Sequence, residues 1–245
     1  MIGFNGGLIG GLANARNTTI IKSNPGVWTL AEQRKAIFSV PTAWPNSSTL
    51  PTVPGEPFEG GYFAGYISFN FDGTATHVLI VAPKATATSL QMKTSNSSTA
   101  GTTSRFDGAL NSSNMNNASH PAAQYCEGLT TGGYSDWYLP ADLELDIAYF
   151  NLKPGTTSNN TGFGVNAYSV PKRTSNYTAG NPAQTSNVDF RTGAAQAFLA
   201  TNYWSSTELY SNFGSAFDFN TGENQRTFSK TDTTNVIAFR KVLIS

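Results

Sequence analysis

The stretch GGYSDWYLPADLEL, residues 132–145, decides the fold of this chain. Its central side chain, Trp137, is large enough to bury roughly 150–250 Å² and so to anchor a hydrophobic core. Leu139 and Pro140 predict that a strand ends and a helix begins here, because proline is favoured in the first turn of a helix. Beyond the proline, apolar residues recur at the spacing of one buried helix face. The stretch therefore predicts a strand followed by a helix.

A second aromatic anchor, YWSSTE, lies at residues 203–208. Two segments with strand character follow it, AFDFNTG at 216–222 and an apolar run at 235–244. We expect the apolar run to form one strand in the middle of a sheet or at a packed edge. The predicted structural core consists of Trp137, Leu139, Pro140, Tyr203 and Trp204.

The remaining C-terminal sequence predicts a mixture of strands, helices and loops. Alternating aromatic residues over 62–71 and an apolar run over 77–82 predict strands. Ser119 is expected to cap a short helix, and another short helix is expected over 194–199. Residues 153–187 are polar and rich in turn residues, and a segment of this length indicates either an ordered functional loop or disorder.

Charge excludes two classes of partner. The 245 residues carry 15 basic and 15 acidic side chains, so the formal net charge is zero. Proteins that bind nucleic acids or anionic membrane surfaces usually carry a basic excess. No apolar run approaches the ~20 residues of a membrane-spanning helix, and the N-terminus lacks the basic residues and unbroken apolar stretch of a signal peptide. We therefore expect no nucleic-acid partner, no membrane insertion and synthesis in the cytoplasm.

The cysteine and histidine content argues against a metal site. Cys126 is the single cysteine, so neither an internal disulfide nor a cysteine-based zinc site can form. The two histidines, His77 and His120, lie in no recognisable motif. We expect Cys126 to be a small buried side chain, and we expect no metal and no cofactor.

The N-terminal part has a different composition from the rest. Residues 1–26 are rich in Gly and Asn and predict an extended arm that becomes ordered only against a partner. Residues 27–38 predict a short amphipathic helix, and the Pro-rich residues 39–60 predict a stiff linker. The predicted organisation is an attachment segment over 1–60 and a folded domain over 61–245.

In their order along the chain, these motifs resemble the Lcl C-terminal domain family, which is related to the formylglycine-generating-enzyme group. The resemblance rests on WYLP at 137–140, YWSSTE at 203–208 and VIAFRKV at 236–242, and it extends over residues 76–245. It implies an α+β domain with a C-type-lectin-like fold.

Three further segments are similar to structural proteins of tailed phages. AQYC at 123–126 and NLKPGTTSNNTG at 151–162 resemble versions of the domain from such phages, and PGVWTLAEQR at 25–34 resembles segments of cyanophage virion proteins. The resemblance implies a virion protein made in the host cytoplasm, with an N-terminal arm that docks onto other virion proteins. By analogy with virion fibres, it also implies a homo-oligomer, a trimer.

Known activities of the related domains do not follow from this resemblance. Sugar-binding C-type lectins coordinate calcium through Glu-Pro-Asn or Gln-Pro-Asp together with Trp-Asn-Asp, and none of these triplets occurs here. The formylglycine-generating relatives depend on cysteines, whereas this chain has one. Acidic residues do cluster around WYLP, but no histidine or metal ligand accompanies them, and those in the first helical turn suit the helix dipole. We expect no enzymatic activity.

The residues expected to contact a ligand lie in the loops between the last strands. They combine flat aromatic rings with amides that adapt their hydrogen bonds, as antibody paratopes do. The alternative is that they are simply exposed turns. The candidate ligand-binding residues are Tyr210, Asn212, Phe213, Asn220, Glu223, Asn224 and Gln225.

Two functions from different classes remain open. The first is a virion surface protein that binds a host-surface glycan or protein as a tail fibre or adhesin. The second is a capsid or tail decoration protein with a purely structural role, which suits an arm that folds on contact. A third, an enzyme acting on cell-surface polysaccharide, would lose activity when its carboxylates are substituted.

Overall fold

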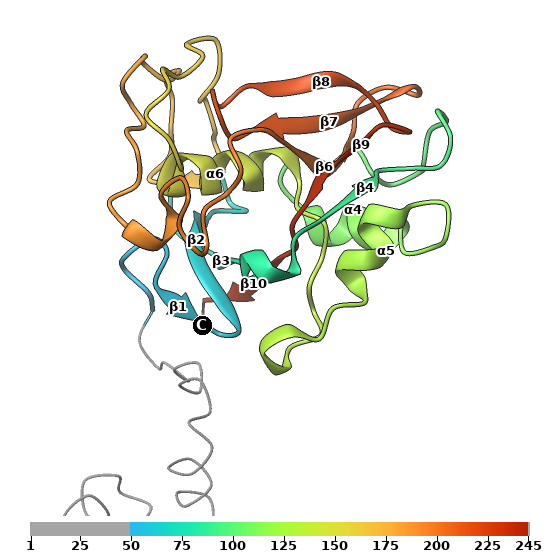
Figure 1. Ribbon diagram of the computed structural model, residues 1–245, viewed down its shortest axis with the longest axis horizontal. Coiled ribbons are helices and arrows are strands. Elements are labelled where there is room, and N and C mark those ends of the chain that lie inside the picture. Colours follow the sequence, from blue (N-terminus) through green and yellow to red (C-terminus); the bar gives the residue numbers. More distant parts are fainter. Residues whose placement is uncertain (1–49, 245) are drawn as a thin grey trace, which may run out of the picture. The chain divides into compact units, whose positions relative to one another are not determined.

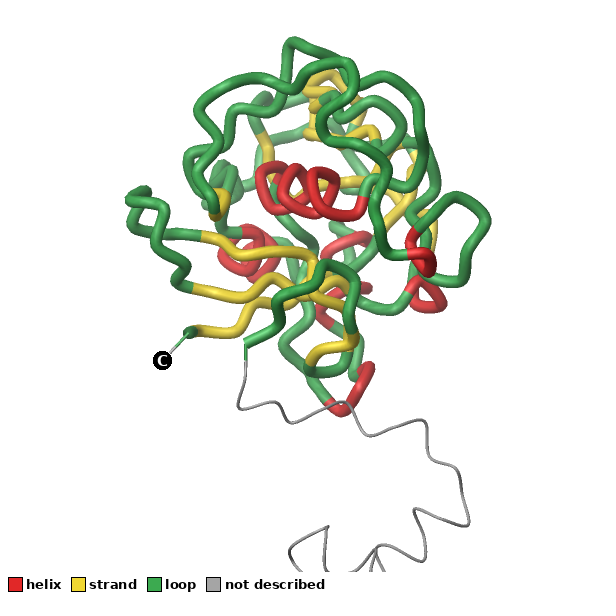
Figure 2. Tube along the Cα trace, turned by 90° about the vertical axis from the view of Figure 1, so that its left-hand side faces the viewer, coloured by secondary structure: helices red, strands yellow, loops and turns green. Residues whose placement is uncertain are grey.

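The computed structural model describes residues 50–244, which form two β-sheets and three α-helices (Figure 1). Each sheet has five strands. Loops and turns make up much of the surface between these elements (Figure 2). The α+β class predicted from the sequence is confirmed for this part of the chain. The predicted arm and the predicted helix over 27–38 lie outside the described residues.

The first sheet is antiparallel throughout. Its strands are β1 (Pro57–Phe58), β2 (Gly61–Ile67), β3 (His77–Val81) and β10 (Phe239–Leu243), in that order, and β5 (Ser169–Val170) pairs with β2. Strands β2 and β3 correspond to the two alternating or apolar runs that predicted strands.

Part of the predicted Pro-rich linker belongs to this sheet. Strand β1 pairs with the start of β2, and Phe58 is buried. The Tyr66 hydroxyl donates a hydrogen bond to the carbonyl oxygen of Pro51 at 2.6 Å. Because β1 lies at the edge of the sheet, a proline in it interrupts no internal ladder. The packed region thus extends upstream of residue 61.

The second sheet combines antiparallel pairs with one parallel pair. In order, its strands are β4 (Thr88–Gln91), β9 (Thr233–Val236), β6 (Asn202–Glu208), β7 (Phe213–Asp218) and β8 (Asn224–Ser229). The pair of β9 with β6 is parallel and the others are antiparallel.

The last apolar run forms two strands rather than the single strand that we predicted. Strand β9 belongs to the second sheet and β10 to the first, with the buried residues Ile237 and Ala238 between them. The prediction was wrong because residues 236–240 are buried without a break across the change of sheet, so hydrophobicity does not mark the point where the chain passes from one sheet to the other.

Helix α6 (Asp142–Leu152) is covered on several sides. It packs against β2 of the first sheet and against β6 and β7 of the second. The shorter helices α4 (Gly108–Asn114) and α5 (Pro121–Glu127) pack against each other and against β6 and β4, respectively. Among the described helices, none combines the length and the apolar character needed to cross a bilayer. Short 3₁₀ turns occupy Lys84–Thr86, Thr131–Gly133 and Val188–Phe190.

Several local predictions were wrong, although helix α5 itself lies where a helix was expected. The residue before helix α5 is His120 rather than Ser119, and its side chain makes no capping hydrogen bond. Pro121 fills the first helical position, where it leaves no N–H to be capped. Residues 194–199 form turns and irregular chain instead of a helix. The strand predicted before Pro140 is also absent, because only Tyr138 pairs there, in a single β-bridge with Phe239.

All five residues expected in the core are buried. Trp137, Leu139 and Trp204 lie in one hydrophobic cluster, and Tyr203 lies in a second cluster together with residues of α6. Both indole N–H groups find backbone acceptors, at Thr131 for Trp137 (3.1 Å) and at Leu90 for Trp204 (3.0 Å). The WYLP and YWSSTE motifs therefore build the framework of the domain.

Candidate ligand-binding site

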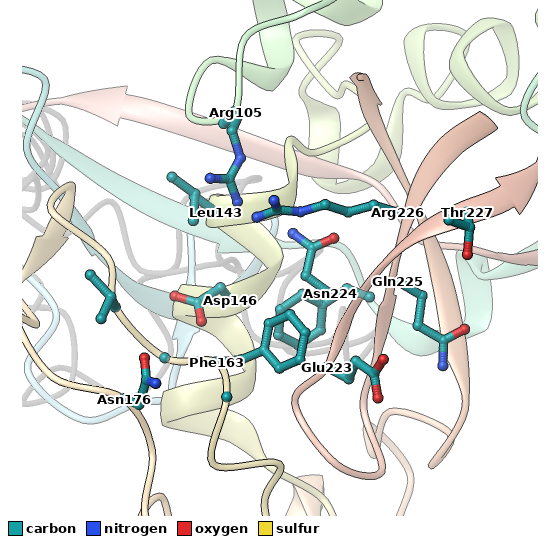
Figure 3. A pocket seen from close by; sticks show the side chains of 14 residues that line it. Arg105, Leu143, Asp146, Phe163, Asn176, Glu223, Asn224, Gln225, Arg226 and Thr227 are labelled. Carbon is teal, nitrogen blue, oxygen red and sulfur yellow. The ribbon is translucent and has the colours of Figure 1, made fainter. Parts of the chain in front are cut away.

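A cavity of about 740 Å³ lies between the N-terminal half of α6, the loop 162–165 and strand β8 (Figure 3). Cavities of this size are typical of small-molecule binding sites. Its lining is polar and charged on several sides, with aromatic rings between. The contacts of these side chains show which of them are occupied within the protein and which remain for a ligand.

Two arginines form one end of the cavity. Arg105 comes from the segment before α4, and Arg226 comes from β8. In Figure 3 their guanidinium groups approach each other from different sides. Both positive charges oppose the rise in the pKa of Asp142 that its burial causes. The Arg226 side chain is exposed and makes no hydrogen bond or ion pair with other described residues.

The buried Asp142 carboxylate binds one of these arginines, Arg105. This carboxylate is completely buried at the start of α6 and accepts hydrogen bonds from Arg105 Nε at 2.9 Å and Asn224 Nδ2 at 2.7 Å. The other carboxylate oxygen, Oδ1, has no hydrogen-bond partner in the described part of the chain. Burial raises the pKa of Asp142, and the charge of Arg105 opposes this. Asp142 thus fixes the direction of the Arg105 guanidinium.

Asp146, one turn further along α6, is part of the cavity wall. Its carboxylate accepts hydrogen bonds from Arg173, from the Tyr177 hydroxyl and from Asn166 Nδ2. The Arg173 guanidinium also stacks over the Phe150 ring, 4.6 Å from its centre. Burial raises the pKa of Asp146, and Arg173 opposes this. The contacts tie the 166–177 segment to α6.

The opposite end of the cavity combines an aromatic ring with amide and carboxylate groups. Phe163 and Asn176 come from the long loop, and Glu223 and Gln225 come from the β7–β8 region (Figure 3). Glu223 accepts a hydrogen bond from Asn160 Nδ2 at 3.1 Å. This end therefore offers a ring face together with hydrogen-bonding groups of both kinds.

Glycine is required at Gly164 for the loop to take this position. Its φ angle is +116°, and an added Cβ would lie 2.5 Å from the backbone nitrogen of Tyr177. That nitrogen donates a hydrogen bond to the Phe163 carbonyl oxygen at 2.6 Å. The close approach of the two chain segments places Phe163 in the cavity wall.

The long segment 153–187, which the sequence left as either an ordered loop or disorder, is an ordered loop. At its start, the buried Lys153 ammonium donates hydrogen bonds to Asn159 Oδ1 at 2.6 Å and to the Pro182 carbonyl oxygen at 3.3 Å. Burial lowers the pKa of Lys153. The segment supplies Phe163 and Asn176 to the cavity.

The seven predicted ligand residues fall into two groups at opposite ends of β7. Glu223, Asn224 and Gln225 line the cavity, and Asn220 lies in the adjoining turn. The other three are exposed in or beside the β6–β7 loop and do not line it: Tyr210, Asn212 and Phe213. The structure does not bring the seven residues together into one site.

Asn224 is already committed to partners within the protein. It is buried, its Nδ2 donates to Asp142, and its Oδ1 accepts from the Ser215 hydroxyl at 2.6 Å. The Asn224 amide therefore supports the cavity wall, and both its nitrogen and its oxygen are already hydrogen-bonded within the protein.

Sequence reasoning missed four candidates for ligand contact: Arg105, Phe163, Asn176 and Arg226. Arg226 directly follows the predicted Gln225, so extending that segment by one residue would have included it. The others come from separate segments that no shared motif connects.

A second polar cluster lies outside the cavity, and its polar groups bond to one another. Lys230 forms an ion pair with Glu208 at 3.1 Å, and Thr99 donates to the same carboxylate. Thr99 also contacts His120 Nε2 at 2.8 Å, and burial lowers the pKa of His120. Lys230, Glu208 and His120 are all buried, so the cluster stabilises loops.

Cys126 is buried, and burial raises the pKa of its thiol. Over residues 50–244, no three His, Cys, Asp or Glu side chains are grouped so that they could hold a metal ion.

Comparison with known proteins does not identify a family. No family model matches the chain, and no curated protein matches it. Among solved structures, it is similar to a fimbrial protein from Bacteroides ovatus ATCC 8483, with 13% sequence identity and a TM-score of 0.41. The match covers 79% of this chain and 45% of the fimbrial chain, less than half of that protein's length.

Proposed function

We propose that this chain is a non-enzymatic recognition protein that binds a glycan in the cavity between α6, the loop 162–165 and β8. The observation that carries the proposal is the lining of this cavity, in which Phe163 lies among amide and charged side chains. Ligand sites typically combine apolar surface with a few polar groups that fix orientation.

A sugar matches this lining in its chemistry. The C–H face of a pyranose ring packs against an aromatic ring such as Phe163, while its hydroxyl groups both donate and accept hydrogen bonds. Gln225 and Asn176 offer amide donors and acceptors, and Glu223 offers an acceptor. Recognition of this kind requires no metal ion.

The carboxylates of the cavity favour binding over hydrolysis. Glycoside hydrolysis usually needs one carboxyl group that donates a proton and a second that attacks or activates water. Asp146 is engaged by Arg173, Tyr177 and Asn166, which makes it part of the wall. Glu223, the other carboxylate of the lining, accepts a hydrogen bond from Asn160 and has no second carboxylate free to act with it among the lining residues.

The proposal includes a C-type-lectin-like fold and a place on a phage particle, both on the strength of the sequence resemblance. In it, the N-terminal arm attaches a trimer to other virion proteins, and the domain is displayed for binding to the host surface. Cryo-electron microscopy of purified particles tests this part. A few copies at the tail are expected, whereas copy numbers matching capsid symmetry would support a decoration protein instead.

The glycan-binding part is tested by substituting one aromatic residue at each end of β7. The full-length protein and its Phe163→Ala and Tyr210→Ala variants are applied to an array of bacterial surface oligosaccharides. Phe163→Ala is expected to weaken binding about tenfold, because the loss of a buried aromatic contact typically costs more than 1 kcal/mol. Tyr210→Ala is the matched control, since Tyr210 is exposed outside the cavity. Failure of the unsubstituted protein to bind any oligosaccharide would refute glycan recognition.

A further inference from the structure

We propose that the glycan bound in this cavity is acidic, and that its carboxylate binds between the guanidinium groups of Arg105 and Arg226. This inference rests on the proposed function, because it assumes that the cavity binds a sugar. It specifies the class of sugar, a uronic acid or another carboxylated saccharide, and the orientation in which it binds.

The charges at the arginine end do not balance within the protein. Arg105 and Arg226 contribute two positive charges, and Asp142 beneath them contributes one negative charge. Asp146 and Glu223 also line the cavity, but Asp146 is paired with Arg173. Two like charges close together repel each other unless an anion lies between them. The arginine end therefore favours an anionic group from outside the protein.

The hydrogen-bonding groups of the arginines point to the same conclusion. Arg105 uses Nε to bind Asp142, and its terminal nitrogens make no hydrogen bond to the other described residues. The Arg226 guanidinium likewise makes no hydrogen bond to the other described residues. Guanidinium groups bind carboxylates through paired, charge-assisted hydrogen bonds. Because Asp142 holds Arg105 in place, less side-chain freedom is lost when a ligand binds there.

The opposite end of the cavity determines how such a sugar is oriented. Glu223 is negative there and repels a carboxylate, while it accepts hydrogen bonds from hydroxyl groups. An acidic sugar therefore places its carboxylate at the arginines and its hydroxyls near Glu223 and Gln225. A neutral sugar lacks the first of these contacts.

Paired oligosaccharides provide the test. Trisaccharides of galacturonic acid and of glucuronic acid, each with its carboxyl-reduced neutral counterpart, are titrated into the full-length protein by calorimetry. The acidic member of at least one pair is expected to bind roughly tenfold to a hundredfold more tightly, the range that charge-assisted hydrogen bonds produce. Equal binding of both members would overturn the acidic-ligand proposal and leave glycan binding intact. Absence of binding by any oligosaccharide, including those of the surface array, would overturn the proposed function as well.

A substitution at Arg226 locates the preference in this cavity. Arg226→Gln is expected to remove most of the difference between the acidic and neutral members, and Arg226→Lys is expected to restore only part of it, because lysine lacks the paired donors. Lys84→Gln removes the same charge outside the cavity lining and is expected to leave the preference unchanged. Arg226 is exposed, so its variants are expected to keep the unfolding temperature of the parent protein. A preference that survives Arg226→Gln would overturn the assignment.

Discussion

The two ends of strand β7 have similar composition but are built into the domain in different ways. At the β7–β8 end, Asn224 binds the buried Asp142 of α6, and Glu223 binds Asn160 of the long loop. At the β6–β7 end, Tyr210 and Asn212 are exposed to solvent. Aromatic and amide residues occur at both ends, so composition alone does not distinguish them. The buried carboxylates of α6 make the difference, because they hold the surrounding segments as the walls of a cavity.

The largest expected effect tests whether these buried charges hold the cavity end together. Arg173→Ala leaves Asp146 buried without its charged partner, and removal of one partner of a buried ion pair typically costs about 3–5 kcal/mol. Urea denaturation measures this loss in the free energy of unfolding. Arg191→Ala is the control, since Arg191 is exposed and its side chain donates only to the backbone carbonyls of Thr185 and Ser186. Similar losses for both variants would contradict a special role for the α6 carboxylates.

A smaller effect is expected from the loop that carries Phe163. Gly164→Ala forces an unfavourable φ angle and a contact with the Tyr177 backbone, and strain of this kind costs roughly 1–3 kcal/mol. Gly133→Ala is the matched comparison, because its φ is also positive but nothing lies within 4 Å of the added Cβ. Urea denaturation of both variants is expected to show the greater loss for Gly164→Ala. Equal losses would mean that the close approach to Tyr177 is not needed.

The smallest effect is expected at the β6–β7 end. The double variant Tyr210→Ala with Asn212→Ala removes exposed side chains, and surface substitutions usually change the free energy of unfolding by less than about 0.5 kcal/mol. Its urea midpoint is expected to equal that of the parent protein, and its glycan binding is expected to be unchanged. A loss of binding would move the recognition surface from the cavity to this loop.

Sequence patterns predicted the framework of the domain better than the cavity. Trp137 and the Leu139-Pro140 step act locally, since their size and backbone preferences suffice to indicate a buried anchor and a helix start. The strand predicted before Pro140 was wrong, because this segment pairs with its neighbour at Tyr138 alone. The split of the last apolar run into β9 and β10 could not be predicted, because hydrophobicity is continuous across it.

The cavity depends on contacts between distant segments. Arg105 binds Asp142 across 37 positions, and Asn224 binds the same carboxylate across 82 positions. No periodicity or motif in the sequence predicts contacts between side chains this far apart along the chain. Residues 223–225 were identified because they follow an anchored strand, whereas Arg105 and Phe163 lie in segments without a comparable signal.

The passage of the chain from β9 to β10 has a consequence for synthesis on the ribosome. Strand β9 separates β4 from β6, and β10 pairs with β3, so both sheets need residues 233–243. Until these residues have left the ribosome, β4 has no neighbour in its sheet and β3 lacks one of its two. Exposed strand edges of this kind are sites of mispairing. The domain is therefore expected to fold after its own translation is nearly complete, with these strand edges covered last.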